Sequence, residues 1–342
     1  PLMRAMFIDF PEDTEAYSLN EQYMFGRNIL VAPIVHESQT VKEIYLPDGE
    51  WIDFFHNALT AGGGTKSYYC SMDSIPVYVR NGAIIPMNMN SDYELGGAIG
   101  NNIDTYTNLT FRIYPSGNSN YTLHHSDGTT MVVSAVESFN TNTVTATVPS
   151  STIPVTLQIF GTNPESVAVN NTTLNRTNTL ESFSAAESGF FYSTEEKMTY
   201  IKLAVASAER TIVLTGVSKA PIEAEHAILE NVTTNTNHLG YWGEGFVDGF
   251  AEVGDTVEFC IYANQAGGME LQIRYSAGTE PGQRTVAVNG SSMTVTLPKT
   301  TDWDTWGIVS IPILLTTGRN TIRISFGSND YAGINLDCIS VR

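Results

Sequence analysis

Basic residues are scarce in this sequence. Lys and Arg total 17 against 36 Asp and Glu, which gives a formal net charge of −19. A partner bound through its phosphate backbone needs clustered Lys and Arg, so this balance argues against a nucleic-acid partner. It indicates instead a secreted protein that acts on neutral substrates and has acidic groups available for Ca²⁺.

Cysteine is also scarce, and the three that occur, Cys70, Cys260 and Cys338, are widely separated. No zinc or redox motif can be built from them, and at least one thiol is free unless it pairs with another chain. No stretch approaches the ~20 apolar residues of a membrane-spanning helix, so we expect no membrane partner. The start of the sequence lacks the basic-then-apolar pattern of a signal peptide, and we expect a longer polypeptide to precede it.

Turn and strand residues, in contrast, are abundant. The sequence has 28 Gly, 14 Pro and many Ser, Thr and Asn, a composition typical of short strands joined by turns. A length of 342 residues predicts two or three domains. The sequence therefore predicts a mainly β protein.

The opening stretch follows a different pattern from the rest. Ile29 to Ala32 form an unbroken apolar run that Pro33 closes, which is typical of a parallel strand buried on both faces. Met3 to Ile8 form a second strand-like run, and Asp13 can cap a short helix. We therefore expect residues 1–36 to be the last strands of a (β/α)8 barrel, completed by polypeptide outside this chain.

After this segment the pattern is antiparallel. Residues 37–108 predict one β-sandwich-like domain, in which Asn81-Gly82 between apolar runs predicts a hairpin. Period-two alternation then predicts a second β-sandwich-like domain over 109–219 and a third β-sandwich, of jelly-roll type, over 220–342.

Four segments in the first part of the chain resemble glycoside hydrolase family 31 in order and spacing. They are P-L-M-R-A-M-F-I-D-F-P-E-D from residue 1, Q-Y-M-F-G-R-N-I-L-V-A-P-I from residue 22, Y-L-P-D-G-E-W-I-D-F from residue 45 and P-V-Y-V-R-N-G-A-I-I-P from residue 76. In that family they mark the last barrel strands and the sandwich behind the barrel. The segments Y-P-S-G from residue 114 and H-S-D-G from residue 125 resemble, more loosely, elements of the family's distal domain.

This resemblance implies a retaining mechanism whose two aspartates lie upstream of residue 1. Such a mechanism needs two carboxylates about 5–5.5 Å apart. Asp9, Asp13 and Asp53 are the candidates within the chain, and we interpret them as turn and cap carboxylates. No catalytic residue is assigned, and the chain alone is expected to be inactive.

The segments P-I-E-A-E-H-A from residue 221, G-Y-W-G-E-G-F-V-D-G-F from residue 240 and G-I-N-L-D from residue 333 resemble a carbohydrate-binding module of family 35, akin to family 6. The resemblance implies a structural Ca²⁺ held by Glu223, Glu225 and Asp337, because the first and last strands would be neighbours. Three carboxylates offer the hard oxygen ligands that Ca²⁺ prefers. The alternative is that Glu223 and Glu225 are exposed carboxylates on one side of a strand and Asp337 is a turn residue.

A sugar is bound by stacking on an aromatic ring and by hydrogen bonds to its hydroxyls. Tyr241, Trp242 and Trp306 are the candidate platforms, and Asn335 is the family-like hydrogen-bonding residue. Trp303 is a further candidate, and any of these tryptophans could instead belong to the core. The family pattern Tyr-Ala-Asn-Gly reads here as Tyr-Ser-Ala-Gly from residue 275, so one Asn that contacts ligand is missing.

Together these resemblances imply the C-terminal part of a secreted enzyme that hydrolyses or transfers α-glucosyl groups, with a Ca²⁺-dependent sugar-binding module. The partners implied are an α-gluco-oligosaccharide and the N-terminal portion of the same enzyme. The alternative is a non-catalytic carbohydrate-binding or scaffold protein.

Overall fold

The computed structural model describes residues 2–69, 75–96, 106–138, 141–217, 221–263 and 266–341. The chain forms two compact units, one made of residues 1–80 with 221–342 and the other of residues 81–220. Cys70 and residues 218–220 lie outside the described residues, and Cys260 and Cys338 are free thiols. No helix in the described part of the chain is long and apolar enough to cross a membrane.

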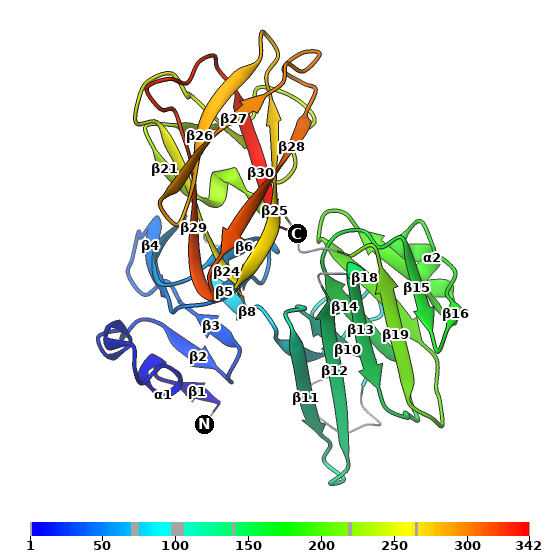
Figure 1. Cartoon of the computed structure of the whole chain (residues 1–342). Coiled ribbons are helices and arrows are strands. Elements are labelled where there is room, and N and C mark those ends of the chain that lie inside the picture. Colours follow the sequence, from blue (N-terminus) through cyan, green and yellow to red (C-terminus); the bar gives the residue numbers. More distant parts are fainter. Residues whose placement is uncertain are drawn as a thin grey trace. The chain divides into compact units, whose positions relative to one another are not determined.

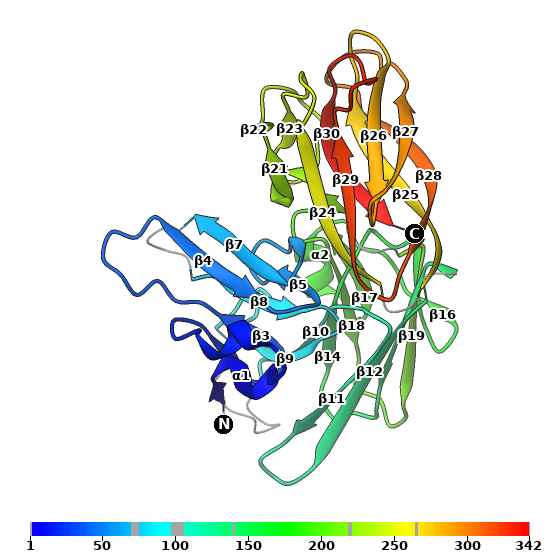
Figure 2. The same cartoon turned by 60° about the vertical axis from the view of Figure 1, so that its left-hand side comes forward.

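The N-terminal segment of the first unit is a six-stranded sheet of order β1-β2-β3-β8-β5-β6 together with a two-stranded ribbon. The ribbon consists of β4 and β7, which lie side by side in Figure 2. Its elements are β1 (Met3–Arg4), α1 (Met6–Asp9), η1 (Thr14–Tyr17), β2 (Tyr23–Phe25), β3 (Ile29–Val31), β4 (Val41–Leu46), β5 (Glu50–Asp53), β6 (Leu59–Ala61), β7 (Gly64–Tyr69) and β8 (Val77–Arg80). Trp51 and Leu30 are buried at the centre of its core. The Arg80 guanidinium covers that core, 4.3 Å from the ring centre of Phe10.

The prediction of barrel strands in residues 1–36 is wrong for the described residues. Strand β3 pairs antiparallel with both β2 and β8, and within it Leu30 is buried while Ile29 and Val31 are half-buried. The chain reverses between β2 and β3 at Gly26, whose φ of +65° suits a residue without a side chain. An apolar run this short fits a strand in a parallel or in an antiparallel sheet, so the run alone could not decide between the two. The strand-like run at Met3 divides into β1 and α1, whereas the helix capped by Asp13 is confirmed as η1.

The second unit is a sandwich of two sheets with orders β17-β18-β14-β10-β9 and β11-β12-β13-β19-β15-β16. Its elements are β9 (Ile84–Met89), β10 (Asn108–Ile113), β11 (Asn118–His124), β12 (Thr130–Ser138), β13 (Thr143–Val148), β14 (Val155–Phe160), β15 (Ser166–Val169), β16 (Thr172–Thr173), α2 (Leu180–Ala185), β17 (Gly189–Ser193), β18 (Met198–Leu203) and β19 (Arg210–Thr215). Alternate residues of β13 are buried between the sheets, as the sequence pattern predicts.

Three predictions for this region need correction. The turn at Asn81-Gly82 does not close a hairpin, because β8 pairs with β3 and β5 while β9 pairs with β10. Strand β9 therefore belongs to the second sandwich, and the boundary drawn at residue 108 moves to about residue 81. The sheet is also mixed, since β10 and β14 pair in parallel.

Residues 221–341 form a β-sandwich with two facing sheets, visible in the upper part of Figure 1. The first sheet has the order β22-β23-β30-β25-β28, with β20 paired to β30, and the second the order β21-β24-β29-β26-β27. Its elements are β20 (Ile222–Glu223), η4 (Ala224–His226), β21 (Ile228–Glu230), β22 (Thr233–Asn235), β23 (Phe246–Asp248), β24 (Thr256–Ala263), β25 (Gly267–Ser276), β26 (Gly282–Val288), β27 (Ser291–Leu297), β28 (Gly307–Leu315), β29 (Gly318–Ser325) and β30 (Asn335–Val341).

The core of this sandwich lies between its two sheets. Leu271, Ile273 and Tyr275 of β25 are buried at every second position and face Ile322 and Ile324 of β29 in one apolar cluster. The predicted β-sandwich over residues 220–342 is thus confirmed. The first and last strands are neighbours as expected, because β20 pairs antiparallel with β30.

Candidate cation and sugar-binding site

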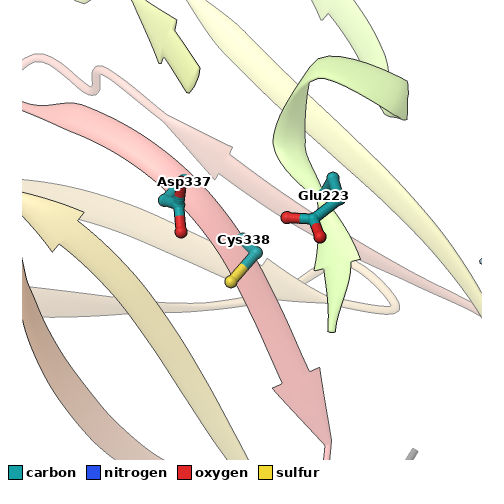
Figure 3. Close-up of side chains that lie close together, drawn as sticks. All are labelled: Glu223, Asp337 and Cys338. Atoms are coloured by element: carbon teal, nitrogen blue, oxygen red, sulfur yellow. The ribbon is translucent and has the colours of Figure 1, made fainter. Parts of the chain in front are cut away.

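Three buried side chains meet where β20 pairs with β30. The ligand atoms of Glu223, Asp337 and Cys338 all lie within 4.8 Å of one another. Figure 3 shows that one of them comes from β20 and two come from β30. Glu223 is 2% exposed and Asp337 is fully buried.

A β-bulge explains why two consecutive residues of β30 can face one site. Arg274 lies opposite Cys338 and Tyr275 lies opposite Leu336, so Asp337 has no partner on β25. A bulge breaks the alternation of a strand and redirects a side chain. It lets Asp337 and Cys338 approach the same glutamate.

Glu225 reaches this site from a different element than the sequence predicted. It lies in the 3-10 helix η4, not two residues further along a strand. Its Oε1 accepts hydrogen bonds from the backbone N–H groups of Glu244 at 2.9 Å and Gly245 at 3.2 Å. Gly243 covers both glutamates, because a Cβ there would lie 2.6 Å from Glu225 Oε1 and 3.0 Å from Glu223 Cδ. A glycine at this position therefore lets the loop approach the carboxylates closely.

The acidic groups disfavour one another's charged forms. Burial, and then the charge of Glu223, raise the pKa of Glu225 to about 8. Burial raises the pKa of Asp337 to about 6, although Arg274 acts in the opposite direction. Glu225 Oε2 is buried and has no hydrogen-bond partner among the described residues.

This donor set fits a hard divalent cation, since buried carboxylates without enough counter-charge bind metals. Burial is the main cause that raises the pKa of the Cys338 thiol well above its usual value, and the negative charge of Glu223 is a smaller one. The thiol therefore stays neutral beside the carboxylates. Of the three predicted metal ligands, Glu223 and Asp337 have ligand atoms within 4.8 Å of each other, and Glu225 lies beside Glu223 beneath Gly243. That these carboxylates bind a cation stays a prediction.

The carboxylate site is joined directly to the aromatic loop. The backbone N–H of Trp242 donates to Asp337 Oδ1 at 2.9 Å. The Arg274 guanidinium forms an ion pair with Asp337 Oδ2 and donates to the Gly240 carbonyl at 2.8 Å. The same guanidinium lies 4.2 Å from the ring centre of Trp242 and 5.2 Å from that of Trp306.

The aromatic side chains are arranged around Phe246, which is fully buried. Tyr241 and Trp306 lie 5.7 and 5.4 Å from it, measured between ring centres. Trp306 also donates its indole N–H to the Leu239 carbonyl at 2.8 Å. Trp242 is 45% exposed, so it is not a core residue, whereas Trp306, Trp303 and Tyr241 are half-buried.

Asn335 lies at the start of β30, and its side chain is directed inside the protein. It is 6% exposed, and its Nδ2 has no hydrogen-bond partner among the described residues. It lies opposite Ser276 on β25, whose hydroxyl donates to the Trp303 carbonyl at 2.9 Å. Ser276, which precedes the position of the family's ligand-contacting Asn, therefore anchors the loop that carries the tryptophans.

Sequence reasoning missed the residues that connect the two loops. Asp304 accepts the Leu239 N–H at 2.8 Å and contacts His238 Nδ1 at 3.1 Å, joining loop 298–306 to loop 236–245. Arg274 and Cys338 were missed as well. The three N-terminal aspartates act structurally, as we interpreted them: Asp9 pairs with Arg4, Asp13 caps η1 and Asp53 caps a turn.

Comparison with known proteins agrees with this geometry. Residues 1–85 match the family described as "Glycosyl hydrolase family 31 C-terminal domain", and residues 220–342 match "Carbohydrate binding module (family 35)". An isomaltosyltransferase of Sporosarcina globispora is 43% identical over 343 residues, which cover 100% of this chain and 31% of that protein. A 1,6-alpha-glucosyltransferase of the same organism is 29% identical over 381 residues, covering 100% of this chain and 29% of that protein.

Two of the solved structures that are similar over the full chain come from Listeria monocytogenes. The cycloalternan-forming enzyme from Listeria monocytogenes, in complex with a pentasaccharide substrate, has 45% identity and a TM-score of 0.88. An uncharacterized protein from the EGD-e strain of that organism, in complex with glucose, magnesium and calcium, has 45% identity and a TM-score of 0.89. The chain covers 32% of each of these structures, so it spans about a third of the length of its relatives.

Proposed function

We propose that this chain, which belongs to glycoside hydrolase family 31 through residues 1–85 and to carbohydrate-binding module family 35 through residues 220–342, is the sugar-binding accessory part of an enzyme that transfers α-glucosyl groups. The observation that carries the proposal is the match of the whole chain, at 43% identity, to an isomaltosyltransferase. Two relatives matched over the whole chain are named as an isomaltosyltransferase and a glucosyltransferase, which favours transfer over hydrolysis.

The catalytic carboxylates belong, in this proposal, to a further part of the same enzyme. Asp9, Asp13 and Asp53 each make a structural contact, which supports their interpretation as turn and cap carboxylates. An apolar surface on the N-terminal segment suits the docking of that part, because exposed apolar patches mark interaction sites. Its residues are Leu2, Met3, Phe7, Ile8, Tyr17 and Phe25, each at least 40% exposed.

The bound cation in this proposal is Ca²⁺, held by Glu223, Glu225 and Asp337. Support comes from the buried oxygen donors, from the raised pKa of Glu225 and from the cradle that Gly243 leaves over both glutamates. Calcium supplies positive charge there and stabilises the fold by binding to the folded state alone.

The sugar site in this proposal is the aromatic loop region. Trp242 offers the exposed ring for stacking, Tyr241 and Trp306 line the site, and Asn335, whose buried amide Nδ2 is unpaired, lies at its inner edge. The ligand is an α-gluco-oligosaccharide, which carries no charge and so suits a protein with a net charge of −19. That charge also supports a secreted location.

The proposal can be tested by measuring the intact mass and the activity of the natural polypeptide that contains this sequence. Its intact mass should correspond to about three times the length of this chain, since the chain covers 31% of its isomaltosyltransferase relative. Incubated with maltotetraose, it should form longer or cyclic α-glucans faster than it releases glucose. A natural polypeptide that binds the sugar but neither transfers nor hydrolyses it would instead establish the non-catalytic binding protein.

A further inference from the structure

We infer that Arg274 is a positioning residue that couples the cation site to the sugar-stacking ring of Trp242. The inference rests on the proposed sugar and cation sites and adds the side chain that joins them. Arg274 is the residue whose guanidinium contacts both an acid of the cation site, Asp337, and the exposed tryptophan.

The first step is the attachment of the aromatic loop to the carboxylates. Asp337 accepts the backbone N–H of Trp242, and Glu225 accepts those of Glu244 and Gly245. Three residues of this loop are therefore held by two of the side chains proposed to hold the cation. If the cation leaves, the buried carboxylates lose the positive charge that favours their ionised forms, so their hydrogen bonds to the loop weaken.

The second step is the position of the indole ring. A backbone hydrogen bond fixes the Trp242 main chain but leaves the side chain free to rotate. The Arg274 guanidinium restricts it, because a planar cation lies 4.2 Å from the ring centre and covers one face of the indole. Since Trp242 is still 45% exposed, part of the ring remains open for a sugar.

The third step is what holds the guanidinium itself. One end pairs with Asp337, the other donates to the Gly240 carbonyl at 2.8 Å, and Trp306 lies 5.2 Å away. The Arg274 side chain is 12% exposed, so it is held within the protein. A lysine could supply the charge to Asp337, but it lacks the planar fork that stacks on an indole and reaches two acceptors.

The consequence is a linkage between two binding events. Ca²⁺ should raise the affinity for sugar, and sugar should raise the affinity for Ca²⁺ by the same factor, within the ~5- to 150-fold range usual for coupled sites. Arg274 transmits this effect to the ring, so its planar group matters in addition to its charge.

The test is calorimetric titration of the full chain with isomaltotriose, in Ca²⁺ and in EDTA, together with thermal melts. For the unaltered protein, chelation should weaken binding by about fivefold or more. Arg274→Lys should keep the Ca²⁺-dependent rise in Tm, but its affinity in Ca²⁺ should fall to about that of the chelated protein. The control is Arg323→Lys, because Arg323 is exposed and pairs with Glu230 and Glu258. This variant should behave like the unaltered protein.

Two results would overturn the inference. One is an affinity of Arg274→Lys for isomaltotriose equal to that of the unaltered protein, which would mean that only the charge of Arg274 matters. The other is loss of the Ca²⁺-dependent rise in Tm together with affinity, which makes it a general structural residue. Failure of the proposed sugar site is separately visible, because Trp242→Ala would then bind isomaltotriose unchanged.

Discussion

Replacing Glu225 by Gln should abolish most of the stabilisation that Ca²⁺ gives, while leaving the cation-free protein at least as stable. The amide keeps an oxygen for the N–H groups of Glu244 and Gly245. Burial, and then the charge of Glu223, raise the pKa of Glu225 to about 8, so at neutral pH the cation-free carboxyl is mostly uncharged and a neutral amide replaces it at little cost. The substitution also removes a negative ligand, so affinity for the cation falls.

The magnitude follows from mass action and from the size of the unit. At a Ca²⁺ concentration 100 times its Kd, a cation that binds the folded state alone adds about 2.7 kcal/mol. Because the unit of residues 1–80 and 221–342 has about 200 residues, each kcal/mol moves Tm by about 2–4 °C. Chelation should therefore lower the Tm of the unaltered protein by roughly 5–10 °C.

The assay is differential scanning calorimetry in Ca²⁺ and in EDTA. Glu225→Gln should lose more than half of the shift, and in EDTA it should melt no lower than the unaltered protein. Glu230→Gln is the matched control, since Glu230 is an exposed acid that pairs with Arg323 away from the site. An equal Ca²⁺ response in the unaltered protein and in Glu225→Gln, or no response in either, would refute the assignment of the cation site.

Three other predictions follow from the structure. Trp242→Ala should weaken isomaltotriose binding in calorimetry with little change in Tm, whereas Phe246→Ala, which removes a fully buried ring, should destabilise the sandwich by about 3–5 kcal/mol in denaturant unfolding. The chain of residues 1–342 alone should release no product from an aryl α-glucoside, and turnover by the pure chain would contradict the placement of the catalytic carboxylates outside it. Stability should fall as the pH rises from about 10 to about 12, because burial and the Asp13 carboxylate raise the pKa of Tyr45 to about 12, so the folded state keeps a proton that the unfolded state loses. Tyr45→Phe should reduce that slope in melts recorded across this pH range, and an unchanged slope would count against it.

Alternation along the strands was readable from the sequence because it is a local property. Val144, Ala146 and Val148 are buried at alternate positions, and Leu271 and Ile273 are buried in the same way. A side chain's face depends on its own strand period, which needs no knowledge of the partner strand. The β-sandwich over residues 220–342 follows from that pattern.

Strand partners were harder to predict, because pairing is decided by contacts distant in sequence. The apolar run at Ile29 fits a parallel strand buried on both faces as well as the antiparallel strand observed. At Asn81-Gly82, local turn chemistry predicts a hairpin, but β9 instead pairs with β10. Local and non-local preferences conflict there, and the non-local pairing prevails.

The sequence named several residues of the candidate site but not Cys338, Arg274 or the contacts that join them. Glu223, Glu225, Asp337 and the aromatic loop are visible as motifs. The bulge that redirects Asp337, and the guanidinium that Arg274 brings from β25, depend on the register of two strands more than 60 residues apart. No spacing within the sequence encodes that register.

Calorimetric titration of the full chain with isomaltotriose, beside cellotriose as the β-linked control, tests the central claim most directly. In the presence of Ca²⁺, the account predicts saturable binding of isomaltotriose, no binding of cellotriose, and loss of the isomaltotriose signal in Trp242→Ala. Equal binding of the two sugars, or no binding of isomaltotriose at millimolar concentrations, would contradict the assignment of this chain as the sugar-binding part of an α-glucosyl-transferring enzyme.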